Sequence, residues 1–405
     1  MLTSIPLRII LFVGVIGLAL FDLRIAVVAQ SSYSGVSRSK AVRKYQQQPR
    51  LLVAYGKQAV LGSGDLQAAE HWYQRALLAN PFYIPAWLAL SELKNDEGDP
   101  VQASAILEYA DGLTRNVARW RWDKAMLAYQ LNRLDILATD LSWLLQQEKV
   151  SGKTKKKAVK LAFSLWPEPD LLLDKMGIEN IAPLFRHAIW TKNLTASGYL
   201  WTTVDKTAPA AKDVLPYINL LINSKEITTA ARIWNKYFPA DTLLYNGNFS
   251  NPIVNSGFGW RIGKRKGVEV EYNSGKNTPL GLHLHFTGSD NVNYYAPRQF
   301  IALPPGQSYV LSGQMRSSGL TTDQKPFVEV VGINCSMQTA RTDMVQADQD
   351  WTSFNLPFIV PKPCDAVQVR IRRIPSNNLD NLIKGDLWLK DFSLRKSNQQ
   401  PESNL

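Results

Sequence analysis

Three arginines, a tryptophan and a glutamine near the C-terminus are the side chains best suited to hold a ligand. Arg370 and Arg372 alternate with apolar residues, and Trp388 lies between two leucines. Gln314 and Arg316 are likewise two residues apart in a third segment. A guanidinium group is planar and its donors match the oxygens of a carboxylate or phosphate, whereas an indole offers a flat apolar surface. These residue types predict a surface that binds an anionic ligand with an apolar side.

The segments that carry these side chains alternate between apolar and polar residues, as half-buried β-strands do. Alternation starts after Pro239 and recurs, between turn residues, at 268–272, 281–286, 309–315, 328–330, 366–371 and 387–389. Many short strands in succession favour a two-sheet sandwich over a parallel α/β fold. We expect the sandwich over residues 241–396, followed by a flexible tail at 397–405. With the apolar residues turned inward, the arginines, the glutamine and the tryptophan are expected on one outer face.

Two histidines in one of these segments could suggest a metal site. His283 and His285 are two of only four histidines, and their spacing places both imidazoles on one strand face. A metal site needs at least a third ligand, which the sequence does not reveal. Exposed strand histidines are therefore the favoured interpretation.

A period of 34 residues organises the N-terminal half. Gly64-Asp65 recurs as Gly98-Asp99, and Ala69, Tyr73 and Ala76 return as Ala103, Leu107 and Ala110. Small residues at fixed places let two helices cross closely, while larger apolar residues fill the space to the next pair. The pattern resembles the tetratricopeptide repeat (TPR). It is clearest over residues 50–112 and then decays, so we expect one solenoid over residues 45–240 with degenerate later repeats.

The N-terminus contains thirteen consecutive residues without a charge, Ile9–Phe21. This is the length of the hydrophobic core of a signal peptide, and an extension to Ala29 would approach the length of a membrane anchor. We expect a signal peptide or inner-membrane anchor at residues 1–29, a linker at 30–44, and a periplasmic or secreted protein. Four basic residues follow this segment: Arg38, Lys40, Arg43 and Lys44. By the positive-inside rule, they favour a cytoplasmic location for the chain after the segment. Charge therefore leaves the orientation open.

The overall charge limits the classes of partner. With 46 Lys+Arg against 34 Asp+Glu, the formal net charge is +12, which favours anionic neighbours such as phospholipid head groups or acidic glycans. The sequence has neither the motifs nor the interleaved aromatic residues of a nucleic-acid-binding protein, so no nucleic acid is expected. The only two cysteines, Cys335 and Cys364, form either a disulfide in an oxidising compartment or two buried thiols.

Short motifs spread over the predicted sandwich carry a resemblance. Asn246-Gly247-Asn248-Phe249 opens the region, Pro304–Tyr309 leads into a central strand, and Gly385–Leu394 closes it. These motifs are similar to those of carbohydrate-binding modules of the galactose-binding-like jelly-roll group, over roughly residues 243–395. Together with the TPR-like helices, the region resembles envelope proteins associated with exopolysaccharide or O-antigen assembly in Gram-negative bacteria.

The resemblance also implies a structural calcium ion between the first and last strands. Asn248 and Asp391 occupy the matching positions. This sequence departs from the family pattern at Ser250, where an acidic residue is common, and at Lys390, where a second aspartate is frequent. Because Ca²⁺ takes six or more oxygen ligands, the loss of carboxylates weakens such a site.

These features predict a multidomain protein, an all-α TPR-like solenoid followed by an all-β jelly-roll sandwich. We expect the solenoid to bind proteins of an envelope polysaccharide assembly system. The sandwich is expected to bind an anionic glycan through Arg316, Arg370, Arg372, Trp388 and Gln314. No nucleophile elbow, phosphate loop or His-Glu-x-x-His motif is present, so we expect no enzyme activity. Two alternatives stay open: a protein-interaction scaffold whose sandwich is purely structural, and a polysaccharide-modifying enzyme.

Overall fold

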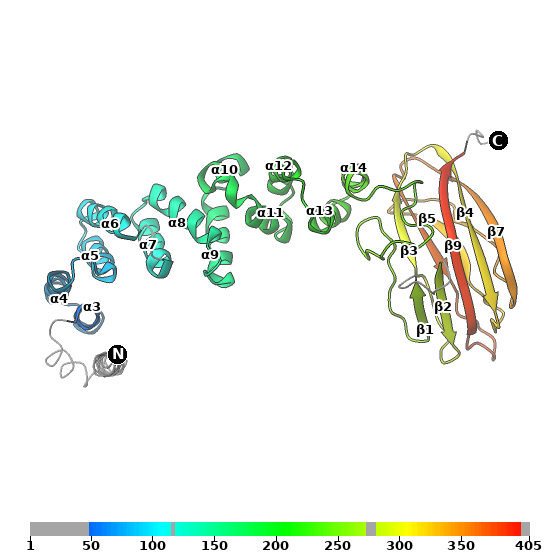
Figure 1. Ribbon diagram of the computed structural model, residues 1–405, viewed down its shortest axis with the longest axis horizontal. Coiled ribbons are helices and arrows are strands. Elements are labelled where there is room, and N and C mark those ends of the chain that lie inside the picture. Colours follow the sequence, from blue (N-terminus) through cyan, green and yellow to red (C-terminus); the bar gives the residue numbers. More distant parts are fainter. Residues whose placement is uncertain (1–47, 115–117, 273–280, 398–405) are drawn as a thin grey trace, which may run out of the picture. The chain divides into compact units, whose positions relative to one another are not determined.

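The computed structural model describes residues 48–114, 118–272 and 281–397. Within these ranges the chain begins with helices and ends with antiparallel strands, which confirms the predicted fold class (Figure 1). The chain divides into two compact units. The first extends to His187 and includes Tyr199–Thr203, and the second comprises Ala188–Gly198 and Val204–Leu405.

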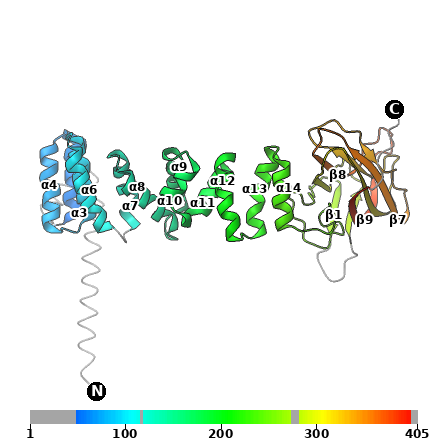
Figure 2. The same cartoon turned by 90° about the horizontal axis from the view of Figure 1, so that it is seen from above.

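Consecutive helices of the first unit pack as pairs, α3 with α4, α5 with α6 and α7 with α8 (Figure 2). The helical elements of the described residues are α3 (Pro49–Gln58), η1 (Ala59–Ser63), α4 (Leu66–Ala79), α5 (Ile84–Asp96), α6 (Pro100–Thr114), α7 (Ala118–Gln130), α8 (Leu134–Gln146), α9 (Gly152–Leu165), α10 (Pro169–Met176), η2 (Ile178–Asn180), α11 (Ile181–Trp190), α12 (Leu194–Val204), η3 (Asp205–Thr207), α13 (Ala211–Asn223) and α14 (Ile227–Tyr237). The residues of the 34-residue pattern are buried between them: Ala69, Tyr73, Ala76, Ala103, Leu107 and Ala110.

The repeated Gly-Asp pair explains how each helix pair turns. Gly64 and Gly98 have φ angles of 66° and 83°, a left-handed conformation that a residue with a Cβ rarely adopts. The aspartate that follows Gly64 then caps the next helix, because its carboxylate accepts a hydrogen bond from the Ala68 amide at 2.9 Å. Asn132, 34 residues after Gly98, has a φ of 54° at the equivalent turn. The period therefore extends into a third pair, as the degenerate pattern predicted.

A buried ionic cluster joins three helices of the first unit. Lys124 of α7 and Asp140 of α8 are fully buried, with 3.0 Å between Nζ and Oδ1. Arg121 also contacts the Asp140 carboxylate at 2.7 Å, and Lys124 contacts Asp111 of α6. Burial raises the pKa of Asp140, although the two cations oppose this shift. Such a cluster fixes the helices relative to one another because each charge is costly to leave unpaired.

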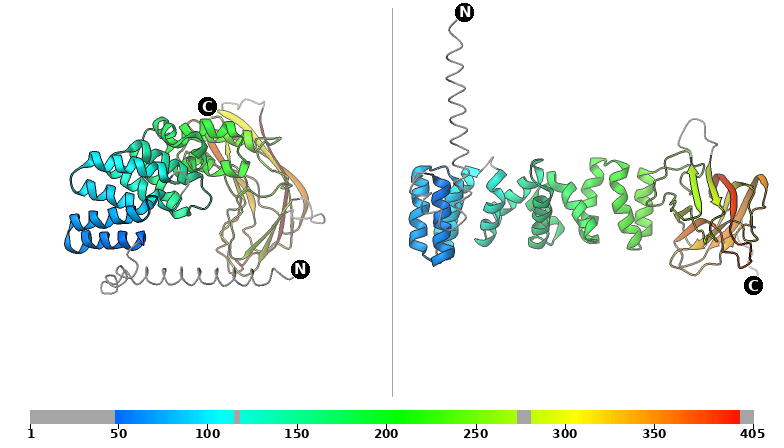
Figure 3. Two further views of the ribbon diagram at one scale, coloured as in Figure 1. Left: turned by 60° about the vertical axis from the view of Figure 1, so that its left-hand side comes forward. Right: turned by 90° about the horizontal axis from the view of Figure 1, so that it is seen from below.

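The strands of the second unit form two sheets. One has five strands in the order β1 (Val268–Tyr272), β2 (Leu282–Thr287), β9 (Lys384–Lys396), β4 (Gln307–Ser318) and β7 (Gln349–Val360). The other has four strands in the order β3 (Arg298–Ala302), β8 (Ala366–Arg372), β5 (Phe327–Gly332) and β6 (Ala340–Arg341). The two sheets face each other as the layers of a sandwich (Figure 3). Apolar side chains from both layers, among them Leu284, Leu387, Val330 and Val369, fill the core between them.

Helices α13 and α14 belong to the same compact unit as the sandwich. The Trp234 indole of α14 packs edge-on against Tyr245 and Phe258, with ring centroids 5.2 and 6.0 Å away. Asn219 of α13 accepts a hydrogen bond from the Gly257 amide at 3.0 Å. The segment that precedes β1 therefore packs against the last helical pair. The predicted boundary at residue 240 marks the change of secondary structure, and as a domain boundary it stays a prediction.

Cys335 and Cys364 form a disulfide, with Cα atoms 5.4 Å apart. Of the two alternatives open from the sequence, the structure thus shows the bonded pair. The bond joins the segment after β5 to the segment before β8 in the four-stranded sheet.

The predicted signal or anchor at residues 1–29 and the linker at 30–44 lie outside the described residues, as does all but Ser397 of the tail. Among the helices of the described ranges, none combines the length and apolar character needed to cross a membrane.

Candidate functional site

The outer face of the five-stranded sheet carries a row of stacked side chains around Trp388. Strand β9 lies between β2 and β4, and Trp388 pairs in register with His283 on one side and Arg316 on the other. The His283 ring stacks on the indole at 4.8 Å with only 5° between the planes. The Arg316 guanidinium carbon lies 5.0 Å from the indole centroid. Both neighbours hold the indole upright on the sheet, and Trp388 stays partly exposed.

A second indole lies near the next outward position of β9. The Lys390 ammonium is 4.3 Å from the centroid of Trp351, which belongs to β7. Lys390 pairs in register with Gln314, whose amide nitrogen lies 3.4 Å from the Ser353 hydroxyl. Two partly exposed indoles, each with a cation beside it, thus share one face with neutral hydrogen-bonding groups.

Acidic groups border the other end of this face. Asp386 lies two residues before Trp388, and its Oδ1 is 2.8 Å from a ring nitrogen of both His283 and His285. Partial burial would raise the pKa of Asp386, but hydrogen bonds from His285 and His283 outweigh it and leave this pKa below its ordinary value. Glu271 lies 3.5 Å from His283 and is largely exposed. The face therefore offers acceptors as well as donors, together with apolar ring surface.

The prediction that all five ligand-binding candidates share one face is wrong. Gln314, Arg316 and Trp388 lie together on the five-stranded sheet, whereas Arg370 and Arg372 lie on β8 of the four-stranded sheet. Alternation along a strand distinguishes outward from inward side chains, but a sandwich has two outward faces. Only the strand order assigns each strand to a sheet.

Arg370 and Arg372 are engaged by the protein itself. Arg370 donates to the buried Glu329 carboxylate at 2.5 Å. Arg372 donates through Nη1 to the Asn293 side-chain oxygen at 2.6 Å and to the Tyr294 carbonyl at 2.9 Å. Burial lowers the pKa of Arg372, with the Arg370 charge adding to the shift and Glu329 opposing it. These two arginines hold the framework of their sheet.

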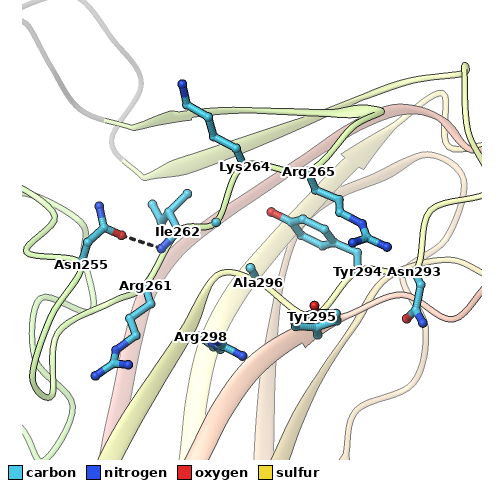
Figure 4. A pocket seen from close by; sticks show the side chains of 11 residues that line it. Asn255, Arg261, Ile262, Lys264, Arg265, Asn293, Tyr294, Tyr295, Ala296 and Arg298 are labelled. Carbon is cyan, nitrogen blue, oxygen red and sulfur yellow. Dashed lines mark hydrogen bonds between the residues drawn. The ribbon is translucent and has the colours of Figure 1, made fainter.

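A basic pocket of about 400 Å³ lies beside the β3 end of the four-stranded sheet (Figure 4). Its walls come from the segment before β1 and the segment that leads into β3. Four cationic side chains line it and no carboxylate does: Arg261, Lys264, Arg265 and Arg298. Figure 4 shows Arg261 and Ile262 on one side, with Tyr294 and Tyr295 on the other.

The residues predicted to hold calcium are not part of a group of acidic side chains within the described ranges. Asn248 and Asp391 are brought near each other, because the Phe392 amide donates to the Gly247 carbonyl at 2.9 Å. The Asn248 oxygen, however, accepts from the amide and hydroxyl of Ser250 at 3.2 and 2.9 Å. Within the described ranges, no group of three or more His, Cys, Asp or Glu side chains is arranged to hold a metal, the His283–His285 pair included.

Several residues of these sites were missed by the sequence analysis. Asp386 and Lys390 alternate with the leucines around Trp388. This alternation alone predicts that both side chains lie on the same strand face as Trp388. His283 was placed correctly on an outer strand face, but no sequence signal pairs β2 with β9. Arg261 and Tyr294 lie in irregular segments, where no periodicity reports which way a side chain points.

Some solved structures are similar to one part of the chain or the other. No protein-family model matches the chain, and no curated protein matches its sequence. Among solved structures, it is similar to a CBM4 module at 17% identity and a TM-score of 0.29, covering 38% of this chain and 99% of that chain. A family 16 carbohydrate-binding module gives 17% identity and a TM-score of 0.26 over 38% and 99%. YrrB, a TPR protein with an unusual peptide-binding site, gives 12% identity and a TM-score of 0.24 over 50% and 90%. At these values the comparisons say nothing about the ligand of this chain.

Proposed function

We propose that this protein is a non-catalytic glycan-binding protein and that the outer face of its five-stranded sheet holds the saccharide. The observation that carries the proposal is the pair of partly exposed indoles, Trp388 and Trp351, on a face with both donors and acceptors. Pyranose rings have an apolar side and a rim of hydroxyl groups that donate and accept hydrogen bonds. The two indoles match the apolar side, and groups such as Gln314 and Asp386 match the rim.

The cations on this face favour a glycan that carries acidic groups. Arg316 and Lys390 are the cations beside the two indoles, and Arg316 is exposed. Charge-assisted hydrogen bonds to a carboxylate are about twice as strong as neutral ones. Asp386 counts against a densely charged ligand, because its own negative charge repels carboxylates. A sparsely acidic glycan fits this mixture best.

The test is affinity electrophoresis of the full-length protein in gels that contain alginate, polygalacturonate, xylan or a β-glucan. We expect one or more of these glycans to retard the wild-type protein. Trp388→Ala and Trp351→Ala should each weaken binding by about five- to thirtyfold, since each removes ring surface worth roughly 1–2 kcal/mol. Trp190→Ala is the matched control, because this indole of α11 is 79% exposed and lies outside the sandwich.

Unchanged retardation in both sandwich variants, with intact circular dichroism, would reject the site. Lack of retardation by any glycan would favour the scaffold alternative, in which the sandwich is structural only. Release of reducing ends from the bound glycan would contradict the non-catalytic part of the proposal.

The first, helical unit is proposed to bind protein partners in the cell envelope. Large apolar side chains are exposed on the first unit, among them Leu61, Leu78 and Phe82 at 87, 84 and 72% exposure. Exposed apolar groups of this size are typical of interaction surfaces. The N-terminal apolar segment and the disulfide support a location in the periplasm. An alkaline phosphatase fused after Leu405 should be active in that location and inactive in the cytoplasm.

A further inference from the structure

The basic pocket beside β3 differs from the outer face around Trp388, which we call the glycan face. The lining of the pocket has cations, amides, phenols and two apolar residues, and no carboxylate. We propose that this pocket binds the oxoanion group of a small ligand, a carboxylate or a phosphate. The proposal does not rest on the proposed function, because the pocket and the Trp388 face share no residue.

Arg261 and Arg298 place two like charges directly opposite each other. Their backbones form an antiparallel bridge, with the Arg261 amide donating to the Arg298 carbonyl at 2.7 Å and the reverse bond at 3.1 Å. Like charges at opposed positions destabilise a strand pair. Burial lowers the pKa of Arg261, and the Arg298 charge lowers it further. The Arg261 guanidinium also donates to the Gly257 carbonyl at 3.1 Å and lies 4.7 Å from the Phe300 ring. An anion bound beside the two arginines would offset their repulsion.

No carboxylate of the protein neutralises this pair within the described part of the chain. Arg298 is in register with Arg370 on β8, and Arg370 is in register with Glu329 on β5. Glu329 contacts Arg370 at 2.5 Å and lies 3.9 Å from Arg372. Glu329, the acidic residue in register with these arginines, therefore pairs with the arginines of β8 and leaves Arg298 without a described carboxylate partner. Neither Arg261 nor Arg298 forms an ion pair with any described residue.

The neutral groups of the pocket include two amide side chains. The Asn255 side-chain oxygen accepts from the Ile262 amide at 2.8 Å, and that of Asn293 accepts from Arg372. Each amide oxygen thus already accepts a hydrogen bond within the protein. A site with four cations and no carboxylate in its lining fits a group that accepts hydrogen bonds, such as a carboxylate or a phosphate dianion.

The Tyr294 hydroxyl provides an independent observation. Its side chain is 1% exposed, and the hydroxyl has no hydrogen-bond partner among the described residues. In Figure 4 the ring reaches across the pocket toward Ile262, with the oxygen at its far end. Burial raises the pKa of Tyr294, so the phenol keeps its proton and can donate it. A buried hydroxyl without a partner is costly, and a ligand oxygen would satisfy it.

The segment that carries Tyr294 is held rigidly. Its backbone exchanges hydrogen bonds with Arg373 at 3.0 and 2.9 Å. The Arg373 side chain is fully buried and donates to the Asn291 side-chain oxygen and the Val292 carbonyl, both at 2.7 Å. Arg372 fixes the adjacent Asn293. Rigid donors lose little entropy when a ligand arrives, which makes the pocket preorganised.

The experiment is isothermal titration of the full-length protein with inorganic phosphate, sodium glucuronate and glucose. We expect phosphate or glucuronate to bind and glucose not to bind. Tighter binding of phosphate would indicate a phosphorylated ligand, and tighter binding of glucuronate a carboxylated one. Arg298→Gln and Arg261→Gln should each weaken binding at least tenfold. Lys266→Gln is the matched control, because it removes a nearby exposed cation that pairs with Asp290 outside the pocket lining. Affinity should also fall as salt rises.

Tyr294→Phe separates ligand binding from a structural role. It deletes only the unpartnered hydroxyl, so the free protein should melt at the same or a higher temperature while anion affinity falls. Lower stability with unchanged affinity would show that the hydroxyl serves the fold. Equal binding of glucose, or unchanged anion binding in both arginine variants, would overturn the proposal. Trp388→Ala should leave phosphate binding intact, so failure here and failure of the proposed saccharide site are distinguishable.

Discussion

The two outer faces of the sandwich use arginine in opposite ways. On the five-stranded sheet, Arg316 lies against the Trp388 indole, is exposed, and has no carboxylate partner among the described residues. On the four-stranded sheet, Arg370 and Arg372 are bound to Glu329, to Asn293 and to backbone carbonyls. The same residue type is therefore exposed on one face and bound within the framework on the other. Partners, rather than residue type, decide which role an arginine has.

The faces also differ in the balance of hydrogen-bonding groups. The glycan face mixes donors with the acceptors Asp386 and Glu271, which suits hydroxyl groups. The pocket at the edge of the four-stranded sheet offers donors and no carboxylate, which suits an oxoanion. The arginines noted in the sequence therefore lie on two surfaces that differ in their hydrogen-bonding groups.

The largest effect should come from the disulfide that braces the four-stranded sheet. Closing a loop of 29 residues is worth about 3.5 kcal/mol in the chain-entropy description. Replacing Cys335 and Cys364 together by serine should lower the unfolding free energy of the sandwich by about that amount. Amide hydrogen exchange of β-strand peptides from the full-length protein measures this loss. Dithiothreitol should reproduce it in the wild type and leave the double variant unchanged; a loss below 1 kcal/mol would contradict the bracing role.

Glu329→Gln tests whether the arginines of β8 depend on their carboxylate. The substitution keeps the shape of the side chain but leaves Arg370 without a charged partner in a half-buried place, so we expect a loss of about 2 kcal/mol. Hydrogen exchange of β5 and β8 reports it. Glu269→Gln, on the exposed side of β1, should change stability by less than about 0.5 kcal/mol. An equal loss of stability in Glu329→Gln and Glu269→Gln would show that the Glu329 carboxylate has no special role in holding the arginines of β8.

Arg316→Ala and Arg370→Ala should give crossed results. Removing Arg316 should weaken glycan binding about tenfold, which corresponds to about 1.4 kcal/mol, without changing stability. Removing Arg370 should lower stability, because Glu329 loses its partner, without changing glycan affinity. Affinity electrophoresis measures the glycan affinity of each variant, and hydrogen exchange measures the stability of each. Loss of glycan binding in Arg370→Ala with its fold intact would reinstate a single binding surface.

The smallest effect concerns the acidic end of the glycan face. The pKa of Asp386 is lower in the folded protein than its usual value of about 3.9, so the ionised carboxylate adds stability above that pH. The contribution is lost as pH falls through the folded pKa, and partial exposure keeps it below about 1 kcal/mol. Asp386→Asn should therefore be less stable than the wild type at pH 6 and equal to it near pH 2. A difference that persists in acid would assign the effect to packing.

Local patterns were enough to predict the two folds. The 34-residue period and its Gly-Asp turns required helix pairs, because a left-handed glycine followed by a capping aspartate both ends one helix and starts the next. The first unit follows this pattern as far as Asn132. In the C-terminal part, alternation identified Leu387 and Leu389 as core residues and Trp388 as outward.

The sequence by itself determined which side chains leave the core, since that depends only on the two-residue period of a strand. It did not determine which of the two outer faces each side chain joins, because strand order is set by pairing between segments far apart in the chain. Trp388 meets His283 from 105 residues earlier, and Arg298 meets Arg370 from 72 residues later. Tertiary structure alone decided that Arg370 and Arg372 support the fold, because a carboxylate and backbone carbonyls reach them there. It likewise paired Arg261 and Arg298 through their backbones, although neither forms an ion pair with a carboxylate among the described residues.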